Sequence, residues 1–126
     1  MSYFLSEPAG TTPFLVVASA EIPSFEVSMG VRIAPVAGER LNLNVVTLEP
    51  GAIAPVHTHP EEQLGYVVSG EVEFSDGTST WTLAPGDCYH AAPMTPHGAR
   101  ALEARVVIID VFSPPRAEVL ALLGRG

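Results

Sequence analysis

Residues 51–70 read G-A-I-A-P-V-H-T-H-P-E-E-Q-L-G-Y-V-V-S-G, and this stretch carries two histidines two positions apart. On an extended strand, His57 and His59 have the same parity, so both imidazoles project from one face of the sheet. Two neutral imidazoles on one face begin a site for Zn, Fe, Ni or Cu. The alternative is that both are polar residues on a solvated strand face. The surrounding glycines and prolines, with Gln63 close by and His97 far downstream, favour a set of metal ligands.

The composition predicts one globular domain over residues 1–126. The chain is 47% hydrophobic and 16% charged, which argues against disorder. Its formal net charge of -8 at pH 7 disfavours nucleic acid or an anionic membrane as a partner. All six basic residues are arginines. Schiff-base chemistry by lysine is therefore excluded, and arginine is the permanent cation available to an anionic substrate.

The sequence also bears on the compartment. The single cysteine, Cys88, cannot form a disulfide within the chain, which fits a reducing environment. Residues 1–10 contain Glu7 and no basic residue, unlike a signal peptide. We find no apolar run long enough to span a bilayer. We therefore expect a cytoplasmic protein.

Short apolar or alternating runs, separated by turns rich in Gly, Pro and Asp, predict an all-β fold. The expected strands are residues 14–19, 31–35, 41–48, 63–69, 71–75, 79–83, 88–92 and 105–112, and residues 23–27 are expected to form a turn that leads into another strand. A short C-terminal helix is predicted with Ser113 as its N-cap, Pro114 at its first position and Gly124 at its end. About nine short strands favour a closed antiparallel sandwich or small barrel, with a jelly roll as the leading case.

Two segments resemble the two sequence motifs of the cupin superfamily in its small single-domain form. Gly51, His57, His59 and Gly70 match the spacing of the first motif, with Gln63 where glutamate is usual. In the second motif Gly86 and His97 match, whereas Ala92, Met94 and Ala101 stand where Pro, Gly and Asn are expected. Glycine at this position normally permits a positive φ, which methionine rarely adopts, so the geometry of the turn at Met94 is left open. The resemblance covers about residues 30–116 and leaves an N-terminal arm over about residues 1–12. It implies a cupin-type jelly-roll antiparallel β-barrel.

A narrower resemblance lies in I-I-D-V-F-S-P-P-R, residues 108–116. With Gln63, this ending is similar to that of the small cupins of pectin and alginate breakdown, which linearise 4,5-unsaturated monouronates to keto acids. The resemblance implies four metal ligands, His57, His59, Gln63 and His97, around one divalent transition metal such as Zn, Ni, Fe or Mn. It also implies a homodimer, with the N-terminal arm contributing.

Several neighbours of these ligands have competing interpretations. Glu62 is the rival of Gln63 as a ligand, and a solvated charge is an equal alternative for its neighbour Glu61. His90 is expected to be an exposed or hydrogen-bonded strand histidine. Cys88 is expected to be a small buried apolar residue. A barrel that keeps the histidines but binds no metal is a further alternative.

Asp110 lies in an otherwise apolar run and shares the parity of Ile108 and Phe112. A carboxyl group on a buried face is costly unless it is paired or neutralised, so Asp110 is a candidate general acid/base with a raised pKa. The alternative is a structural partner for an arginine or a backbone amide. Arg116, near the start of the predicted helix, is the candidate for binding a substrate carboxylate, or else forms a salt bridge with Asp110 or a glutamate.

The leading hypothesis is a metal-dependent cupin that acts on a small anionic sugar acid by proton transfer and hydration. Asp110 would move the proton, Arg116 would hold the carboxylate, and Phe112 would shape the pocket or simply pack in the core. Tyr66 and Tyr89 are left without assigned roles, because parity is lost across the intervening turns. The alternatives are an Fe(II)-dependent dioxygenase and a non-catalytic domain that binds small molecules.

Overall fold

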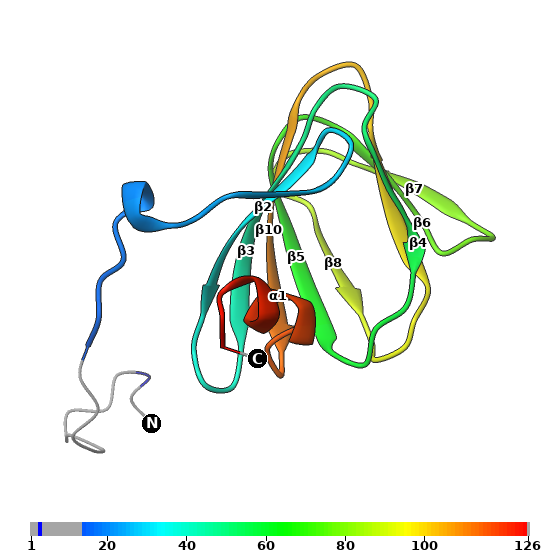
Figure 1. The fold of residues 1–126 in the computed structure, drawn as a ribbon. Helices are drawn as coiled ribbons and strands as arrows, with labels where there is room; N and C mark the ends of the chain where they lie inside the picture. The colour runs from blue at the N-terminus through cyan, green and yellow to red at the C-terminus, as the bar shows by residue number, and fades with distance from the viewer. Residues whose placement is uncertain (1–2, 4–13, 126) are drawn as a thin grey trace.

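The computed structural model describes residues 3 and 14–125 as two antiparallel sheets that face each other around a common core (Figure 1). The six-stranded sheet has the order β1-β2-β3-β10-β5-β8, and the four-stranded sheet has the order β4-β9-β6-β7. The elements are a 3-10 helix η1 (Ser19–Glu21), β1 (Phe25–Ser28), β2 (Val31–Ala37), β3 (Asn42–Leu48), β4 (Ile53–His57), β5 (Glu62–Ser69), β6 (Val72–Ser75), β7 (Thr80–Leu83), β8 (Cys88–Ala91), β9 (His97–Ala101), β10 (Val106–Ser113) and α1 (Ala117–Leu122). The expected all-β jelly roll with a short C-terminal helix is confirmed.

The core lies between the two sheets and follows the two-residue period of the strands. In β10 the inward residues alternate strictly with partly exposed ones, from Val106 to Phe112. Leu48, Val67 and Val72 are almost completely buried in the same core. Each such side chain contributes roughly 1.5–3 kcal/mol by leaving water. Asp110 takes its place in this inward row, so the parity argument about its face is confirmed.

Two strands that carry the site were not predicted. β4 contains Pro55, and β9 (H-G-A-R-A) contains Gly98 and no β-branched residue, so neither has a typical strand composition. Tertiary pairing determines both. A Cβ atom at Gly98 would lie 2.7 Å from the backbone N of Val56 and 2.8 Å from the carbonyl O of Ala54. Only glycine lets β9 approach β4 this closely.

The prediction of a strand over residues 14–19 is wrong. Residues 14–18 are irregular, and Ser19 begins the 3-10 helix η1. The apolar pattern of this segment has no neighbouring strand to pair with among the described residues, and Phe14, Leu15 and Val16 are exposed. The N-terminal arm predicted over about residues 1–12 lies, apart from Tyr3, outside the described residues.

The C-terminal helix begins later than predicted. Ser113 is the last residue of β10, and Arg116 is the N-cap of α1. The Ser113–Pro114 peptide is cis, and Ser113 Oγ donates a hydrogen bond to Arg40 O at 2.9 Å. Helical dihedral angles are disfavoured for a residue that precedes proline, so the helix does not include Ser113 and begins at Ala117. None of the helices in the described part of the chain has the length and hydropathy to cross a membrane.

Met94 adopts the backbone conformation that the second cupin motif normally gives to glycine. Its φ of 64° makes it the only non-glycine residue at positive φ within the described part of the chain. Its backbone N–H donates to His59 O at 2.8 Å, so this strained residue joins the loop before β9 to the loop after β4. The left-handed conformation expected for glycine is therefore retained with methionine.

Candidate metal centre

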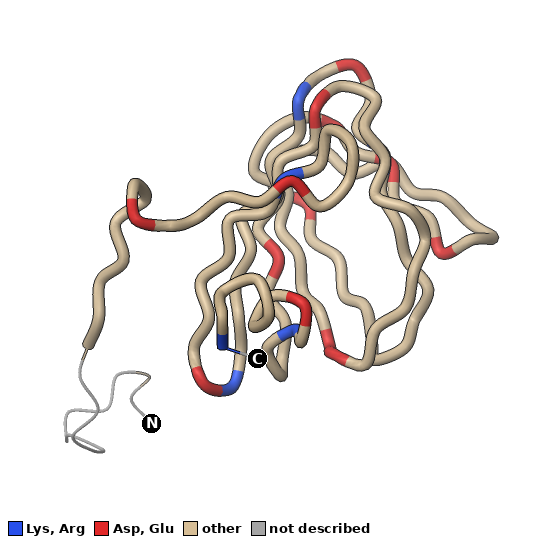
Figure 2. The backbone as a smooth tube through the Cα atoms, viewed as in Figure 1, with Lys and Arg blue, Asp and Glu red and all other residues tan. Residues whose placement is uncertain are grey.

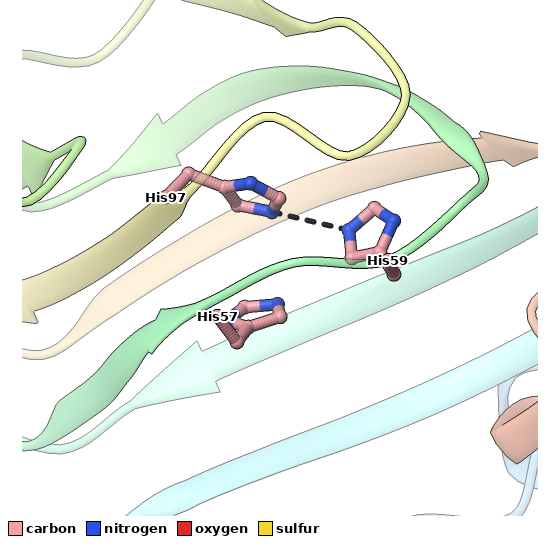
Figure 3. Close-up of side chains that lie close together, drawn as sticks. All are labelled: His57, His59 and His97. Atoms are coloured by element: carbon pink, nitrogen blue, oxygen red, sulfur yellow. Dashed lines mark hydrogen bonds between the residues drawn. The ribbon is translucent and has the colours of Figure 1, made fainter.

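Three histidines from two loop-bounded strands converge at one point (Figure 3). His57 is the last residue of β4 and pairs in register with His97, the first residue of β9. His59 lies two residues beyond β4, so it is on a loop and not on the strand that its spacing suggested. The potential ligand atoms of all three lie within 4.8 Å of one another.

The tautomers of the three imidazoles are fixed by backbone carbonyl groups. A carbonyl oxygen only accepts, so each Nδ1 must carry a proton, and in a neutral imidazole the Nε2 then presents a lone pair. The three bonds run from His57 Nδ1 to Pro55 O (2.8 Å), from His59 Nδ1 to Glu61 O (3.0 Å) and from His97 Nδ1 to Thr95 O (2.7 Å). Metal-binding histidines are commonly oriented by bonds of this kind.

Gln63, near the start of β5, completes the cluster. Its Oε1 lies 2.9 Å from His59 Nε2 and 3.0 Å from His97 Nε2. Its amide nitrogen donates to the Tyr89 hydroxyl at 2.6 Å, which turns the amide oxygen toward the histidines. The rival, Glu62, points elsewhere: it is half exposed and bonds to His90 Nε2 at 2.7 Å. The expectation of a hydrogen-bonded strand histidine at position 90 is therefore confirmed.

The donor set fits a divalent transition metal. The Nε2 atoms of His59 and His97 are 3.1 Å apart, a contact drawn as a dashed line in Figure 3, yet both are acceptors in the tautomers above. Two lone pairs this close repel each other unless a proton or a metal cation lies between them. Neighbouring ligands each ~2.1 Å from one ion and at right angles are about 3.0 Å apart, which agrees with the separations seen here. Burial lowers the pKa of both His59 and His97, which favours the neutral, ligating form.

A hydrogen-bonded chain leads from the cluster to Asp110. Gln63 donates to Tyr89, and the Tyr89 hydroxyl in turn donates to Asp110 Oδ1. Burial raises the pKa of Asp110 to about 6, although hydrogen bonds from Tyr89 and Gln63 act in the opposite direction. Burial and the charge of Asp110 also raise the pKa of Tyr89, so the phenol remains a neutral donor. The prediction of a raised pKa at Asp110 is confirmed, and Tyr89 is a site neighbour that sequence parity could not place.

Arg116 and Phe112 lie behind His59. The edge of the Phe112 ring packs against His59 with the ring centroids 5.6 Å apart, and the Arg116 guanidinium carbon is 5.6 Å from the same Phe112 ring. Arg116 forms ion pairs with Glu61 at 3.7 Å and Glu118 at 3.3 Å, in agreement with the glutamate alternative.

Glu61 is the residue that sequence reasoning misjudged most. The alternative of a solvated charge is wrong, because Glu61 is 5% exposed and its Oε1 lies 3.4 Å from His59 Nδ1. The Oε1 atom and Arg116 Nε are both buried without a hydrogen-bond partner. The turn between β4 and β5 determines which of the two adjacent glutamates points inward. The residue pattern H-P-E-E-Q contains no signal that predicts which one it is.

Two other expectations concern β5 and β8. Cys88 is exposed, so its prediction as a buried apolar residue is wrong. It pairs with Tyr66, which is also half exposed, on the outer face of the six-stranded sheet. Tyr66 therefore does not reach the cluster.

The cavities of the molecule divide into two groups. A small one of about 60 Å³ inside the barrel is lined by His57, Gln63, His97, Asp110 and Tyr89, among others. A wider depression of about 850 Å³ lies at the β5–β6, β7–β8 and β9–β10 loops, and its lining includes none of these residues. The chemistry is thus concentrated in the small interior cavity.

Comparison with known proteins assigns the fold and the motifs. The family model described as Cupin domain matches residues 44–112, which include all four residues of the cluster. The chain belongs to the cupin family. It is 33% identical over 102 residues to the pectin degradation protein KdgF of Dickeya dadantii (strain 3937), a match that spans 79% of this cupin and 93% of that relative.

Solved structures agree with this assignment. The structure of KdgF from Halomonas sp. superposes with a TM-score of 0.75 at 33% identity and covers 82% of this cupin and 97% of that chain. An RmlC-like cupin from Shewanella frigidimarina NCIMB 400 superposes with a TM-score of 0.76 at 25% identity, covering 82% and 93%. The chain is therefore similar over nearly the whole length of a small pectin-degradation cupin.

Proposed function

We propose that this cupin is a metal-dependent enzyme that opens the ring of 4,5-unsaturated monouronates, a non-redox reaction in which one water is added. The observation that carries the proposal is the chain from the acceptor-only cluster through Tyr89 to the buried Asp110. The similarity to KdgF, a pectin degradation protein, supports the substrate class. His57, His59, Gln63 and His97 would hold the ion. When bound, it would supply Lewis acidity toward a substrate oxygen.

Asp110 moves the proton in this scheme. A carboxyl group with a pKa of about 6 holds a proton part of the time near neutral pH and can also accept one. It protonates C4 of the enol ether while the oxygen of water bonds to C5, and the proton released by water returns to Asp110. The hemiketal then opens by breaking the bond from C5 to the ring oxygen. The C5 hydroxyl loses its proton and becomes the ketone, and the ring oxygen takes a proton and becomes a second hydroxyl group on C1, which is then an aldehyde hydrate.

Arg116 binds the substrate carboxylate in the proposal, and Phe112 limits the space beside His59. The Arg116 side chain is 20% exposed and already faces Glu61 and Glu118. A substrate carboxylate must therefore compete with Glu118, the more exposed of the two partners, at 69%. This competition favours small substrates that also reach the metal.

The experiment follows the loss of enol-ether absorbance with an unsaturated monouronate and metal-loaded protein. We expect Asp110→Ala to lower kcat by roughly 100-fold or more, the usual loss for a general acid/base. Glu62→Gln, a matched change of an exposed carboxylate next to the cluster, should leave the rate unchanged. Absorbance that falls no faster with the wild-type protein than without it would refute the proposal. Oxygen uptake by the Fe(II)-loaded protein would favour a dioxygenase instead.

We also propose that the protein is a homodimer. The outward face of the six-stranded sheet is apolar across three neighbouring strands: Val111 of β10 pairs with Leu43 of β3 and with Leu64 of β5, and the next outward row is equally apolar. An antiparallel sheet whose outer face meets water normally alternates with polar residues. Residues 14–17, which extend away from the barrel, are also apolar and exposed (Figure 1). A second copy is the occupant that would cover both surfaces.

A further inference from the structure

A second cavity lies directly beside the cluster, at the seam between the two sheets. β7 ends the four-stranded sheet and β8 ends the six-stranded sheet, and no strand pairing within the described residues joins these edges. The cavity between them has a volume of about 280 Å³, and its walls include Phe74, Trp81, Tyr89, His90 and His97. Phe74, Tyr89 and His97 also line the small interior cavity that holds Gln63 and Asp110. The seam cavity and the interior cavity therefore share three lining residues, one of them the cluster residue His97.

Trp81 forms the outer wall of this cavity. It pairs in register with Phe74, so the two side chains lie on the same face of the sheet. Phe74 is buried and packs on the Tyr89 ring with centroids 4.4 Å apart, which identifies that face as the inner one. Trp81 nevertheless remains 53% exposed, because the barrel is open beside it. An inward-facing tryptophan that the described residues leave half exposed presents its ring to whatever enters the cavity.

Asp76 supplies a carboxylate to the lining of this cavity. Asp76 Oδ1 accepts hydrogen bonds from the backbone N–H groups of Thr78 (2.9 Å) and Ser79 (2.7 Å). Glu62 is bonded to His90. The Asp76 carboxylate is thus held in place by two backbone donors, and the rest of the lining is mostly aromatic and apolar.

We propose that the sugar ring of the substrate binds in the seam cavity with its apolar C–H face on Trp81 and its reacting end at His97. This inference rests on the proposed function, and it names the subsite. Aromatic rings bind such faces because the contact removes apolar surface from water while the hydroxyl groups stay at the edge. A volume of about 280 Å³ lies just below the range of drug-sized sites, about 300–1,000 Å³. It suits one pyranose ring, so monouronates are bound in preference to oligouronates.

The test uses the fact that Trp81 is the single tryptophan of the chain. Its fluorescence therefore reports on this site alone. Zinc-loaded wild-type protein is titrated with galacturonate, a saturated monouronate that lacks the reacting double bond. We expect a saturable change in the intensity or wavelength of emission, and a much weaker response to the trimer of galacturonate.

Kinetics provide the second measurement. Trp81→Ala should raise KM for the unsaturated monouronate by roughly tenfold, the loss expected for one aromatic contact, with kcat changed little. Trp81→Phe should restore most of the affinity. Thr82→Ala, on the same strand and the opposite face, is the matched control and should leave KM unchanged.

The outcomes separate this inference from the proposed function. If the wild type opens the unsaturated uronate but its emission ignores galacturonate and Trp81→Ala keeps its KM, the subsite is wrong and the reaction stands. If emission responds saturably while no turnover occurs, the subsite stands and the proposed reaction falls. The wild-type titration needs no variant, so poor folding of Trp81→Ala cannot leave the question undecided.

Discussion

Gln63 has two contacts that a glutamate could not make together. Its amide oxygen faces the imidazoles, and its amide nitrogen donates to Tyr89. Because three imidazoles and an amide are all neutral, a bound ion keeps its full positive charge and is a stronger Lewis acid. An amide oxygen is also a weaker ligand than a carboxylate. Compared with a glutamate, Gln63 therefore makes a bound metal a stronger Lewis acid and lowers the affinity for that metal.

The first prediction concerns Gln63→Glu. We expect tighter metal binding by about tenfold or more, since a negative ligand is added, together with a lower kcat. The measurement is competition with a chelator, alongside the enol-ether assay. Glu62→Gln is the control and should change neither quantity. A variant that binds metal less tightly than the wild type would contradict the assignment of Gln63 as a ligand.

The second prediction concerns the ionisation of Asp110. Its pKa is raised from 3.8 to about 6 in the folded protein, so the folded chain binds this proton more tightly than the unfolded chain. The resulting stability is fully present below pH ~4 and is lost as the pH rises through about 6, in total on the order of 3 kcal/mol. In Asp110→Asn this dependence should disappear.

The measurement is the free energy of unfolding of metal-free wild type and Asp110→Asn, by denaturant, at pH 4, 5, 6 and 7. Other groups titrate in both proteins, so the difference between the two is the informative quantity. We expect it to shift in favour of the variant as the pH rises. A difference that stays constant over this range would show that Asp110 does not titrate there.

At the scale of elements, the chain of hydrogen bonds depends on a position of β5 that has no side chain. Gly65 lies between Gln63 and Val67 on the inward face of β5 and pairs in register with both Tyr89 and Asp110. A Cβ atom there would overlap the Tyr89 ring and lie 2.7 Å from Asp110 Oδ1. Because Gly65 has no side chain, the Tyr89 ring can occupy this space, and its hydroxyl group reaches Asp110.

The third prediction is that Gly65→Ala displaces Tyr89 and uncouples Gln63 from Asp110. We expect a loss of roughly 1–3 kcal/mol in the free energy of unfolding, the usual cost of overpacking, and a fall in kcat. Gly38→Ala is the matched control, because a Cβ there meets its nearest atom at an ordinary 3.5 Å. Unchanged stability and activity in Gly65→Ala would mean that Tyr89 moves aside freely.

At the scale of the whole molecule, charge and apolar surface are separated. Figure 2 shows most acidic and basic residues at the turns and loops, and the acidic residue in the middle of the six-stranded sheet is Asp110, whose side chain is buried inside. In the middle of this sheet, Ile109 pairs with Val45 on one side and Tyr66 on the other, all facing outward. Leu64 and Tyr66 are 57% and 47% exposed. A surface of this kind is typical of an interface between protein chains.

The fourth prediction is that Leu64→Glu and Tyr66→Glu convert a dimer to a monomer, since each would place a charge in the apolar interface. The measurement is molar mass by light scattering after size exclusion. Ile53→Glu is the control, because Ile53 is equally exposed, at 54%, but lies on β4 of the other sheet. A wild-type protein that is already monomeric would refute the proposed assembly.

The sequence by itself determined what depends on local period and spacing. Strict alternation along residues 105–112 was enough to place Asp110 on the face of Ile108 and Phe112, because adjacent residues of a strand must point to opposite sides. The spacing of His57, His59, Gln63 and His97 was enough to indicate one cluster, since the cupin motifs carry it. The strands with β-branched residues were predicted for the same local reason.

Tertiary structure alone decided what depends on pairing across turns. It chose Glu61 over Glu62 as the buried acid, brought Tyr89 between Gln63 and Asp110, and left Cys88 outside. It also made strands of β4 and β9, whose own residues disfavour them. The physical reason is that a turn resets the parity of side chains, and the register beyond it is fixed by packing against segments distant in the chain.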